Sequence, residues 1–307
     1  MIDIDLATQS TIDELAYQKN KNKLSYHAKL IYDYRNLGTY LIDMEKDKLD
    51  SHPEISLAVI GIFRRLIELM DACAILIQEG SILPMHPIMR IMLELGFQFE
   101  FLLNDPTRIK EKALCIFIAE LYDELRQANK RIAIPNIEKL QPITDIQNQI
   151  NIYQNKIDNV IFDPIRTKYD TATMIKGGPN IGTRKQFSVF WFTISDSINT
   201  VTDLRASLNR EAMQELIYSE FSKTVHSNSL ISDSLHQVDG KVIIKPIRDA
   251  HDIEANTNAV IKVASYMYKV MWPRQSYEEQ AEYFRARESF IRRYPQFKSA
   301  VLLNIVL

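Results

Sequence analysis

Residues 87–106 read PIMRIMLELGFQFEFLLNDP, and this stretch decides the predicted fold. Apolar side chains occupy most positions after Pro87, with helical rather than alternating spacing. A helix that is apolar nearly all round is expected to be buried among other helices. Arg90 and Glu94 interrupt the apolar run four residues apart, so they share one face. Gly96 lies inside the helix, where glycine is unfavourable, and predicts a close approach of another helix.

Helical periodicity extends outward on both sides of this stretch. We predict an all-α, multi-helix bundle of about eight helices with at most a small β-hairpin near 236–246, where Asp239 and Gly240 suit a tight turn. The expected helices cover about 11–49, 53–79, 84–103, 107–133, 144–159, 197–208, 209–226, 252–271 and 276–293. The pattern fails between 161 and 192, and 175–186, IKGGPNIGTRKQ, is predicted to be an exposed loop.

Composition narrows the class of protein. The chain has 307 residues and only 8 glycines, and it contains no GxGxxG, GxxxxGK[ST] or GxSxG motif. Dinucleotide-binding sheets and P-loop enzymes, which need glycine at fixed turns, are therefore excluded. We expect a helical extension over 1–50, a core domain over 51–272 and a C-terminal helix with an apolar tail over 273–307.

Charge and cysteine usage bear on location and partners. The 37 basic and 39 acidic side chains give a net charge of −2, which argues against a dedicated nucleic-acid scaffold but not against a local basic patch. Cys73 and Cys115 lie in apolar stretches and are expected to be small buried hydrophobes in a reducing compartment. No signal peptide or membrane span is predicted, so a cytoplasmic protein without membrane contact is expected.

Two pairs of polar residues are the candidates for chemistry. The first is Arg90 and Glu94; the second is Ser222 and His226, also four residues apart on a predicted helix. An imidazole can act as a general base, an arginine can neutralise a phosphate, and a carboxylate can orient either group. These groups suffice to cleave RNA without a metal ion or cofactor. The alternative is that both pairs form a buried polar network that fixes helix packing.

Other charged groups have more ordinary interpretations. Arg64, Glu68 and Asp71 form one polar stripe, which is typical of an ion-pair network. Basic residues of the predicted loop, and Arg64 on its helix, are candidates to bind a phosphate backbone: Arg64, Lys176, Arg184 and Lys185. The chain has no HExxH motif and no paired ExxH motif, so no metal site is predicted.

The order of these motifs resembles a bacterial helical family catalogued as domain of unknown function 5677. The stretches that carry the resemblance are 60–80, 87–106, FWFTIS at 190–195 and LIYSEFSKTVHS at 216–227. The residues that match the recurrent features are Arg90, Glu94, Trp191, Tyr218, Ser222 and His226. The resemblance covers roughly residues 55–270.

The layout is also similar to that of the HEPN superfamily, whose helical domains include metal-independent endoribonucleases of toxin–antitoxin and phage-defence systems. This resemblance implies a homodimer that cleaves or binds RNA, or a nucleotide, and a protein partner encoded nearby. His226 would then be the general acid or base, Arg90 the phosphate ligand, Glu94 an orienting group and Ser222 a supporting hydrogen bonder. The usual motif places arginine and histidine on one helix, whereas here they would converge from two.

Overall fold

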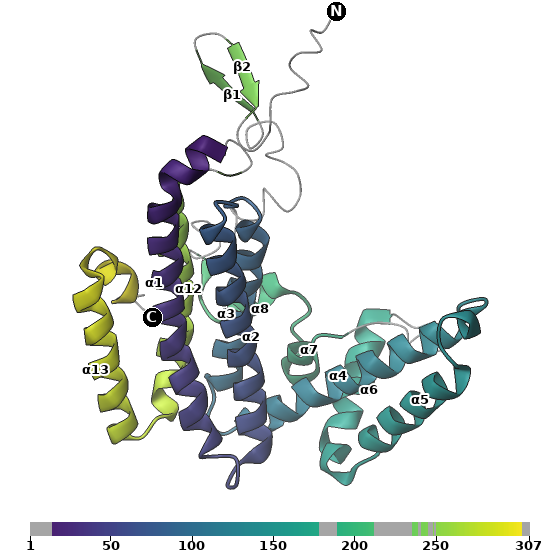
Figure 1. Ribbon diagram of the computed structural model, residues 1–307. Coiled ribbons are helices and arrows are strands. Elements are labelled where there is room, and N and C mark those ends of the chain that lie inside the picture. Colours follow the sequence, from purple (N-terminus) through teal and green to yellow (C-terminus); the bar gives the residue numbers. More distant parts are fainter. Residues whose placement is uncertain are drawn as a thin grey trace, which may run out of the picture. The chain divides into compact units, whose positions relative to one another are not determined.

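The computed structural model describes residues 14–177, 189–211, 235–238, 241–244, 248 and 250–302. The described part is helical apart from a two-stranded hairpin, so the predicted all-α class is confirmed (Figure 1). The helices are α1 Glu14–Lys46, α2 Pro53–Gln78, α3 Met85–Leu103, α4 Ile109–Ile132, α5 Ile143–Ile157, α6 Asp163–Gly177, α7 Trp191–Asp196, α8 Val201–Ser207, α12 Ile253–Met271, α13 Tyr277–Arg293 and α14 Lys298–Val301. Strands β1 Leu235–Val238 and β2 Lys241–Ile244 pair antiparallel.

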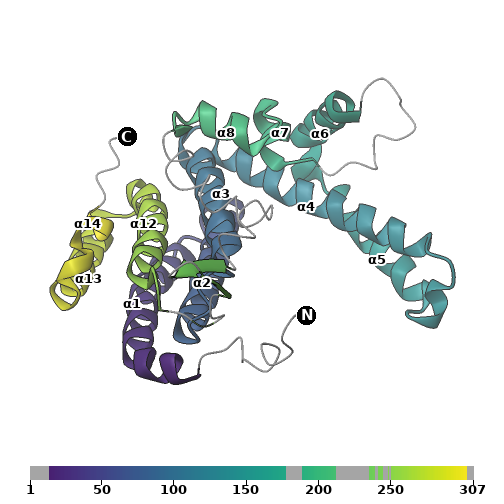
Figure 2. The ribbon, with the colours of Figure 1, turned by 90° about the horizontal axis from the view of Figure 1, so that it is seen from above.

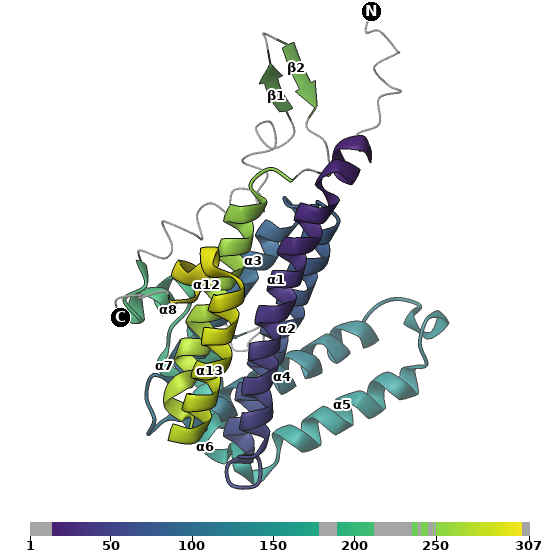
Figure 3. The same ribbon diagram turned by 60° about the vertical axis from the view of Figure 1, so that its left-hand side comes forward.

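The chain forms two compact units, and each unit is built from segments that are not contiguous in the sequence. Unit 1 comprises 1–48, 59–100 and 210–307, and unit 2 comprises 49–58 and 101–209. Unit 1 therefore holds α1, most of α2 and α3, the hairpin and α12 to α14 (Figure 3). Unit 2 holds α4 to α8 (Figure 2), and Figure 3 shows α4 and α5 as a helical hairpin.

Helix α12 is the centre of unit 1, because two of its tyrosines reach opposite neighbours. Tyr268 packs against α1, where a Cβ at Gly38 would lie 2.5 Å from its hydroxyl oxygen. Tyr266 packs against α3, where a Cβ at Gly96 would lie 2.8 Å from its Cε1 atom. Both rings are almost completely buried. The close helix approach predicted at Gly96 is therefore confirmed, and a second one occurs at Gly38.

Helix α2 completes this core through aromatic contacts. The Phe63 ring lies 4.9 Å from the Phe99 ring of α3 and 5.9 Å from that of Tyr268, measured between centroids. At the end of α2, Gly80 has a φ of 69°, and the amide of Ser81 donates to the carbonyl of Leu76. This left-handed closure is the helix stop expected at Gly80.

A buried histidine joins α1 to the start of α12. His27 is 5% exposed, and its Nδ1 atom lies 3.0 Å from Oγ1 of Thr257. Because the Thr257 hydroxyl donates to the carbonyl of Ile253, it is the acceptor for an Nδ1–H group of His27. Burial lowers the pKa of His27, nearby Lys23 lowers it further, and Glu254 opposes the shift. The folded chain thus favours the neutral form of His27.

In unit 2, α4 packs against α5, α6 and α7. A small cluster of Ala128, Ile137 and Ile146 seals α4 to α5, with Ile132 and Ile150 at its margin. The rings of Tyr122 and Tyr169 stack at 3.8 Å between α4 and α6.

One sequence expectation about element boundaries was wrong. Helix α6 occupies part of the stretch where the pattern was expected to fail, and its buried residues Ile165, Tyr169 and Ala172 do have helical spacing. The helix expected over 209–226 lies outside the described residues from 212 onward; Asn209 itself has a φ of 54°, and its amide donates to the carbonyl of Ala206 at the end of α8. The hairpin was predicted correctly, and its register pairs Val238 with Lys241.

We expect Gly96→Ala to lower the free energy of unfolding by about 1–3 kcal/mol, since the added methyl group overlaps the Tyr266 ring. Gly61→Ala, in α2, is the matched control: nothing lies within 4 Å of a Cβ there, so it should stabilise the chain by up to ~1 kcal/mol. Urea unfolding measures both. Equal effects of the two substitutions would contradict the close approach.

Burial of neutral His27 predicts a pH dependence of stability. Its folded pKa lies below the unfolded value of about 6.5, so the stability is fully present above that pH and is lost as the pH falls below it. We expect His27→Gln to show a shallower loss of stability than the parent chain between about pH 7 and pH 5. Parallel curves for the two proteins would mean that folding does not lower the pKa of His27.

Candidate functional site

A polar stripe runs along α3 in unit 1. Nε of Arg90 donates to Oε1 of Glu94 at 3.0 Å, and the two side chains are 22% and 24% exposed. His86 precedes Arg90 by four residues on the same face, and its Nε2 atom lies 3.1 Å from Oδ1 of Asn256 in α12. The stripe is therefore neither sealed in the core nor fully solvated. It places a guanidinium, a carboxylate and an imidazole on one helix face.

The remaining candidates for catalysis and RNA binding are placed only in part. Ser222, His226, Arg184 and Lys185 lie outside the described residues. Lys176 belongs to the last turn of α6, in unit 2. Arg64, on α2 in unit 1, is 74% exposed and pairs with Glu68 at 3.1 Å. The structure thus confirms that Arg90 pairs with Glu94. It shows Arg64 in an ordinary surface ion pair with Glu68.

A second polar cluster in unit 1 was not expected. Arg210 holds Glu100 with two hydrogen bonds, from Nε at 3.0 Å and from Nη2 at 2.5 Å. The hydroxyl group of Tyr266 donates to the same carboxylate. The Arg210 and Glu100 side chains are only 9% and 14% exposed, so this bidentate pair is largely desolvated.

The electrostatics of this cluster agree with its geometry. Burial raises the pKa of Tyr266, and the adjacent charge of Glu100 raises it further. Burial alone would lower the pKa of Arg210, but the bond to Glu100 raises it instead. The Glu100 carboxylate thus accepts hydrogen bonds from two different side chains. The signal in the sequence was Gly96, one helical turn before Glu100, because the glycine admits the ring whose hydroxyl group reaches that carboxylate.

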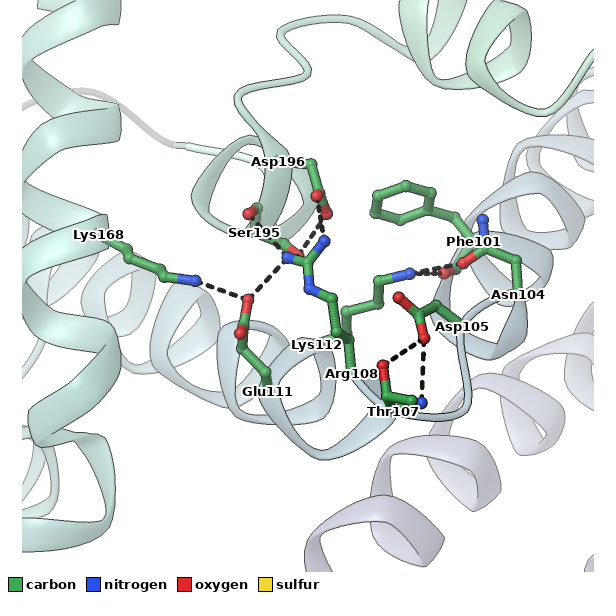
Figure 4. A network of polar contacts seen from close by, with 10 residues as sticks. All are labelled: Phe101, Asn104, Asp105, Thr107, Arg108, Glu111, Lys112, Lys168, Ser195 and Asp196. Atoms are coloured by element: carbon green, nitrogen blue, oxygen red, sulfur yellow. Dashed lines mark hydrogen bonds and ion pairs between the residues drawn. The ribbon is translucent and has the colours of Figure 1, made fainter.

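Unit 2 has its own network, centred on Arg108 before the start of α4 (Figure 4). Nη1 donates to Oδ1 of Asp196 at 2.5 Å, and Nη2 donates to Oε1 of Glu111 at 2.8 Å. Nη2 also lies 3.2 Å from both Ser195 oxygens, and Lys168 of α6 donates to Glu111 at 2.7 Å. Although burial opposes it, hydrogen bonds to Arg108 lower the pKa of Asp196 and of Glu111. The network joins α4, α6 and α7.

The turn after α3 is fixed by a buried lysine. Lys112 is 2% exposed, and its Nζ atom donates to the carbonyl of Phe101 at 2.7 Å and to Oδ1 of Asn104 at 2.6 Å. The ammonium also lies 4.2 Å from the Phe101 ring centroid. Oδ1 of Asp105 accepts from the amide and the hydroxyl group of Thr107. Because Lys112 satisfies the end of α3, the Asn-Asp-Pro turn has a structural role.

Few other groups in the described ranges suggest chemistry. Cys73 and Cys115 are buried and free, as predicted, and burial raises the pKa of each thiol to about 12. Among the described residues, no three His, Cys, Asp or Glu side chains gather closely enough to hold a metal ion. None of the helices described is both long and apolar enough to cross a membrane.

Comparison with known proteins places the chain in a family. It belongs to the family of unknown function DUF5677, whose profile matches residues 56–242. This range includes the α3 stripe, the Asn-Asp-Pro turn and the Arg108 network. No curated protein and no solved structure matches the chain significantly.

The Glu94–Arg90 and Glu100–Arg210 pairs, whose glutamates both lie on α3, should contribute very differently to the free energy of unfolding. Glu100→Gln leaves the buried Arg210 charge without its partner and should lower the free energy of unfolding on the order of 3 kcal/mol. Glu94→Gln removes a partly exposed pair and should cost less than ~1 kcal/mol. Thermal and urea unfolding test this. A larger loss for Glu94→Gln would show that the stripe, not the Glu100 cluster, supports the packing.

Proposed function

We propose that the chain is a metal-independent endoribonuclease whose α3 stripe binds the RNA backbone through Arg90. The observation that carries the proposal is the partly exposed Arg90–Glu94 pair on a largely apolar helix. A guanidinium fixed by a carboxylate is already oriented, so less side-chain freedom is lost when it binds a phosphate. Glu94 is the orienting group in this scheme.

His226 supplies the proton transfer in the proposed reaction. Its imidazole removes the proton of a ribose 2′-hydroxyl group, and that oxygen then attacks the adjacent phosphorus. The 5′-oxygen of the next nucleotide leaves and takes up a proton from water, to which His226 returns the proton it removed, giving a 2′,3′-cyclic phosphate and a free 5′-hydroxyl end. Arg90 stabilises the phosphorane charge, and Ser222 supports the imidazole by hydrogen bonding.

Basic residues outside the α3 stripe bind the RNA backbone in this proposal. Arg64, Lys176, Arg184 and Lys185 contact phosphates along the bound strand. The protein acts in the cytoplasm as a homodimer, as a toxin or phage-defence effector with a protein partner encoded nearby. The resemblance of the sequence layout to that of HEPN domains supports this context.

A helical binding module without catalysis is the second candidate. The buried Arg210–Glu100–Tyr266 cluster in the same unit favours this second candidate. Its polar groups hydrogen-bond to one another and stabilise the packing of α3 against α12. If the Arg90–Glu94 pair had the same role, its loss would destabilise the chain rather than abolish an activity.

Substitution of the proposed site residues separates the two candidates. We expect Arg90→Ala and His226→Ala each to reduce cleavage of end-labelled single-stranded RNA in EDTA by roughly a hundredfold or more, with little change in melting temperature. Arg285→Ala on α13 is the control, since that side chain is 73% exposed and outside the stripe.

Two results would overturn the nuclease proposal. One is unchanged cleavage in the Arg90 and His226 variants, which would assign any activity to other residues. The other is unfolding of both variants together with unfolding of Arg90→Lys, which preserves the charge. That second outcome favours the non-catalytic module.

A further inference from the structure

Unit 2 contains a cavity that is separate from the α3 stripe. Its volume is about 540 Å³, within the range of small-molecule sites. Helix α4, the end of α5 and the short helix Val160–Phe162 surround it. The lining side chains are Phe117, Glu120, Leu121, Glu124, Lys156, Asn159, Ile161 and Phe162.

The walls of the cavity are held in place without a ligand. Oδ1 of Asn159 accepts from the amide of Ile161 at 3.0 Å, which caps the short helix. Arg166 donates to the carbonyl of Ile157 at 3.1 Å, at the end of α5. The apolar cluster around Ile146 fixes α5 against α4 farther along the hairpin. The site is therefore preorganised by contacts that do not involve its carboxylates.

The cavity carries an excess of negative charge. Glu120 and Glu124 lie four residues apart on α4, where like charges repel. Within the described ranges neither carboxylate forms an ion pair, and the polar contact of Glu124 is the Tyr153 hydroxyl group at 3.3 Å. Lys156 is the one cation of the lining, so two carboxylates against one ammonium leave a net charge of −1. Burial and then the charge of Glu124 raise the pKa of Glu120.

The apolar side chains of the lining indicate that a ligand of this cavity would also have an apolar part. Phe117 and Leu121 come from the same face of α4 as the two carboxylates, and Ile161 and Phe162 face them from the short helix. An alkyl or aromatic body would lie between these side chains, with a positive group at the carboxylates. The carbonyl end of α5 also favours a cation at this edge. Water or a metal ion would leave the apolar walls unused.

We propose that this cavity binds a small organic cation, an ammonium group attached to an apolar body. The ammonium interacts with Glu120 and Glu124 and removes their mutual repulsion, and the body packs between Phe117, Leu121 and Phe162. This binding site lies in unit 2 and does not depend on the RNA-directed function proposed for the α3 stripe.

Isothermal titration of the full chain with 2-phenylethylamine at neutral pH tests the proposal. We expect saturable binding, and at least tenfold weaker binding of 2-phenylethanol, which has the same body without the charge. The double variant Glu120→Gln/Glu124→Gln should lose at least tenfold in affinity, while its melting temperature stays the same or rises. Glu138→Gln, an exposed residue outside the cavity, is the matched control.

The outcomes are distinct from those of the ribonuclease test. Equal binding of 2-phenylethanol would show an apolar groove without charge selection and would overturn the proposal. Unchanged affinity in the double variant, or no saturable binding of the amine, would also overturn it. RNA cleavage by the same variants reports separately on the ribonuclease proposal, because Glu120 and Glu124 have no role in the proposed cleavage reaction.

Discussion

The packing of two α12 tyrosines against glycines on neighbouring helices is the constraint on which unit 1 depends. Tyr268 fits against Gly38 of α1 and Tyr266 against Gly96 of α3, so α12 is held from two sides. This contact fixes more than helix spacing, since the Tyr266 hydroxyl group reaches Glu100 and joins it to Arg210. It also holds in place the helix that carries Arg90 and Glu94. A glycine-poor chain thus places two of its few glycines where a tyrosine of α12 packs against a neighbouring helix.

Each unit contains an arginine held by carboxylates, and the two have different exposures. Arg210 and Glu100 are nearly desolvated, so their bidentate pair stabilises a particular arrangement of α3 and α12. Arg108 in unit 2 is one-third exposed and shares several acceptors on α4 and α7. Arg90 lies between the two in exposure, at 22%, and Glu94 orients it. We propose Arg90 as the phosphate ligand because it is more exposed than Arg210, and because Arg108 already donates to carboxylates on both α4 and α7.

Local features were predictable from the sequence, whereas partners distant in the chain were not. Helical spacing of apolar residues predicted the main helices, and Gly80 predicted the end of α2. The spacing of four residues between Arg90 and Glu94 predicted that they would pair. Gly96 predicted a close approach, but the identity of the approaching ring required the fold. Glu100 and Arg210 are more than a hundred residues apart, and nothing in their local sequence pairs them. His86 was missed although it lies four residues before Arg90, because only its contact with Asn256 draws attention to it.

Photocrosslinking of RNA to the full chain is the most direct test of the central claim that the α3 stripe is an RNA-binding surface. A single-stranded RNA with 4-thiouridine would be crosslinked and the modified peptides identified by mass spectrometry. We predict crosslinks in the α3 peptide that contains Arg90 and in the peptide that contains His226, both competed by unlabelled RNA. Crosslinks confined to other peptides, or their complete absence, would contradict the claim.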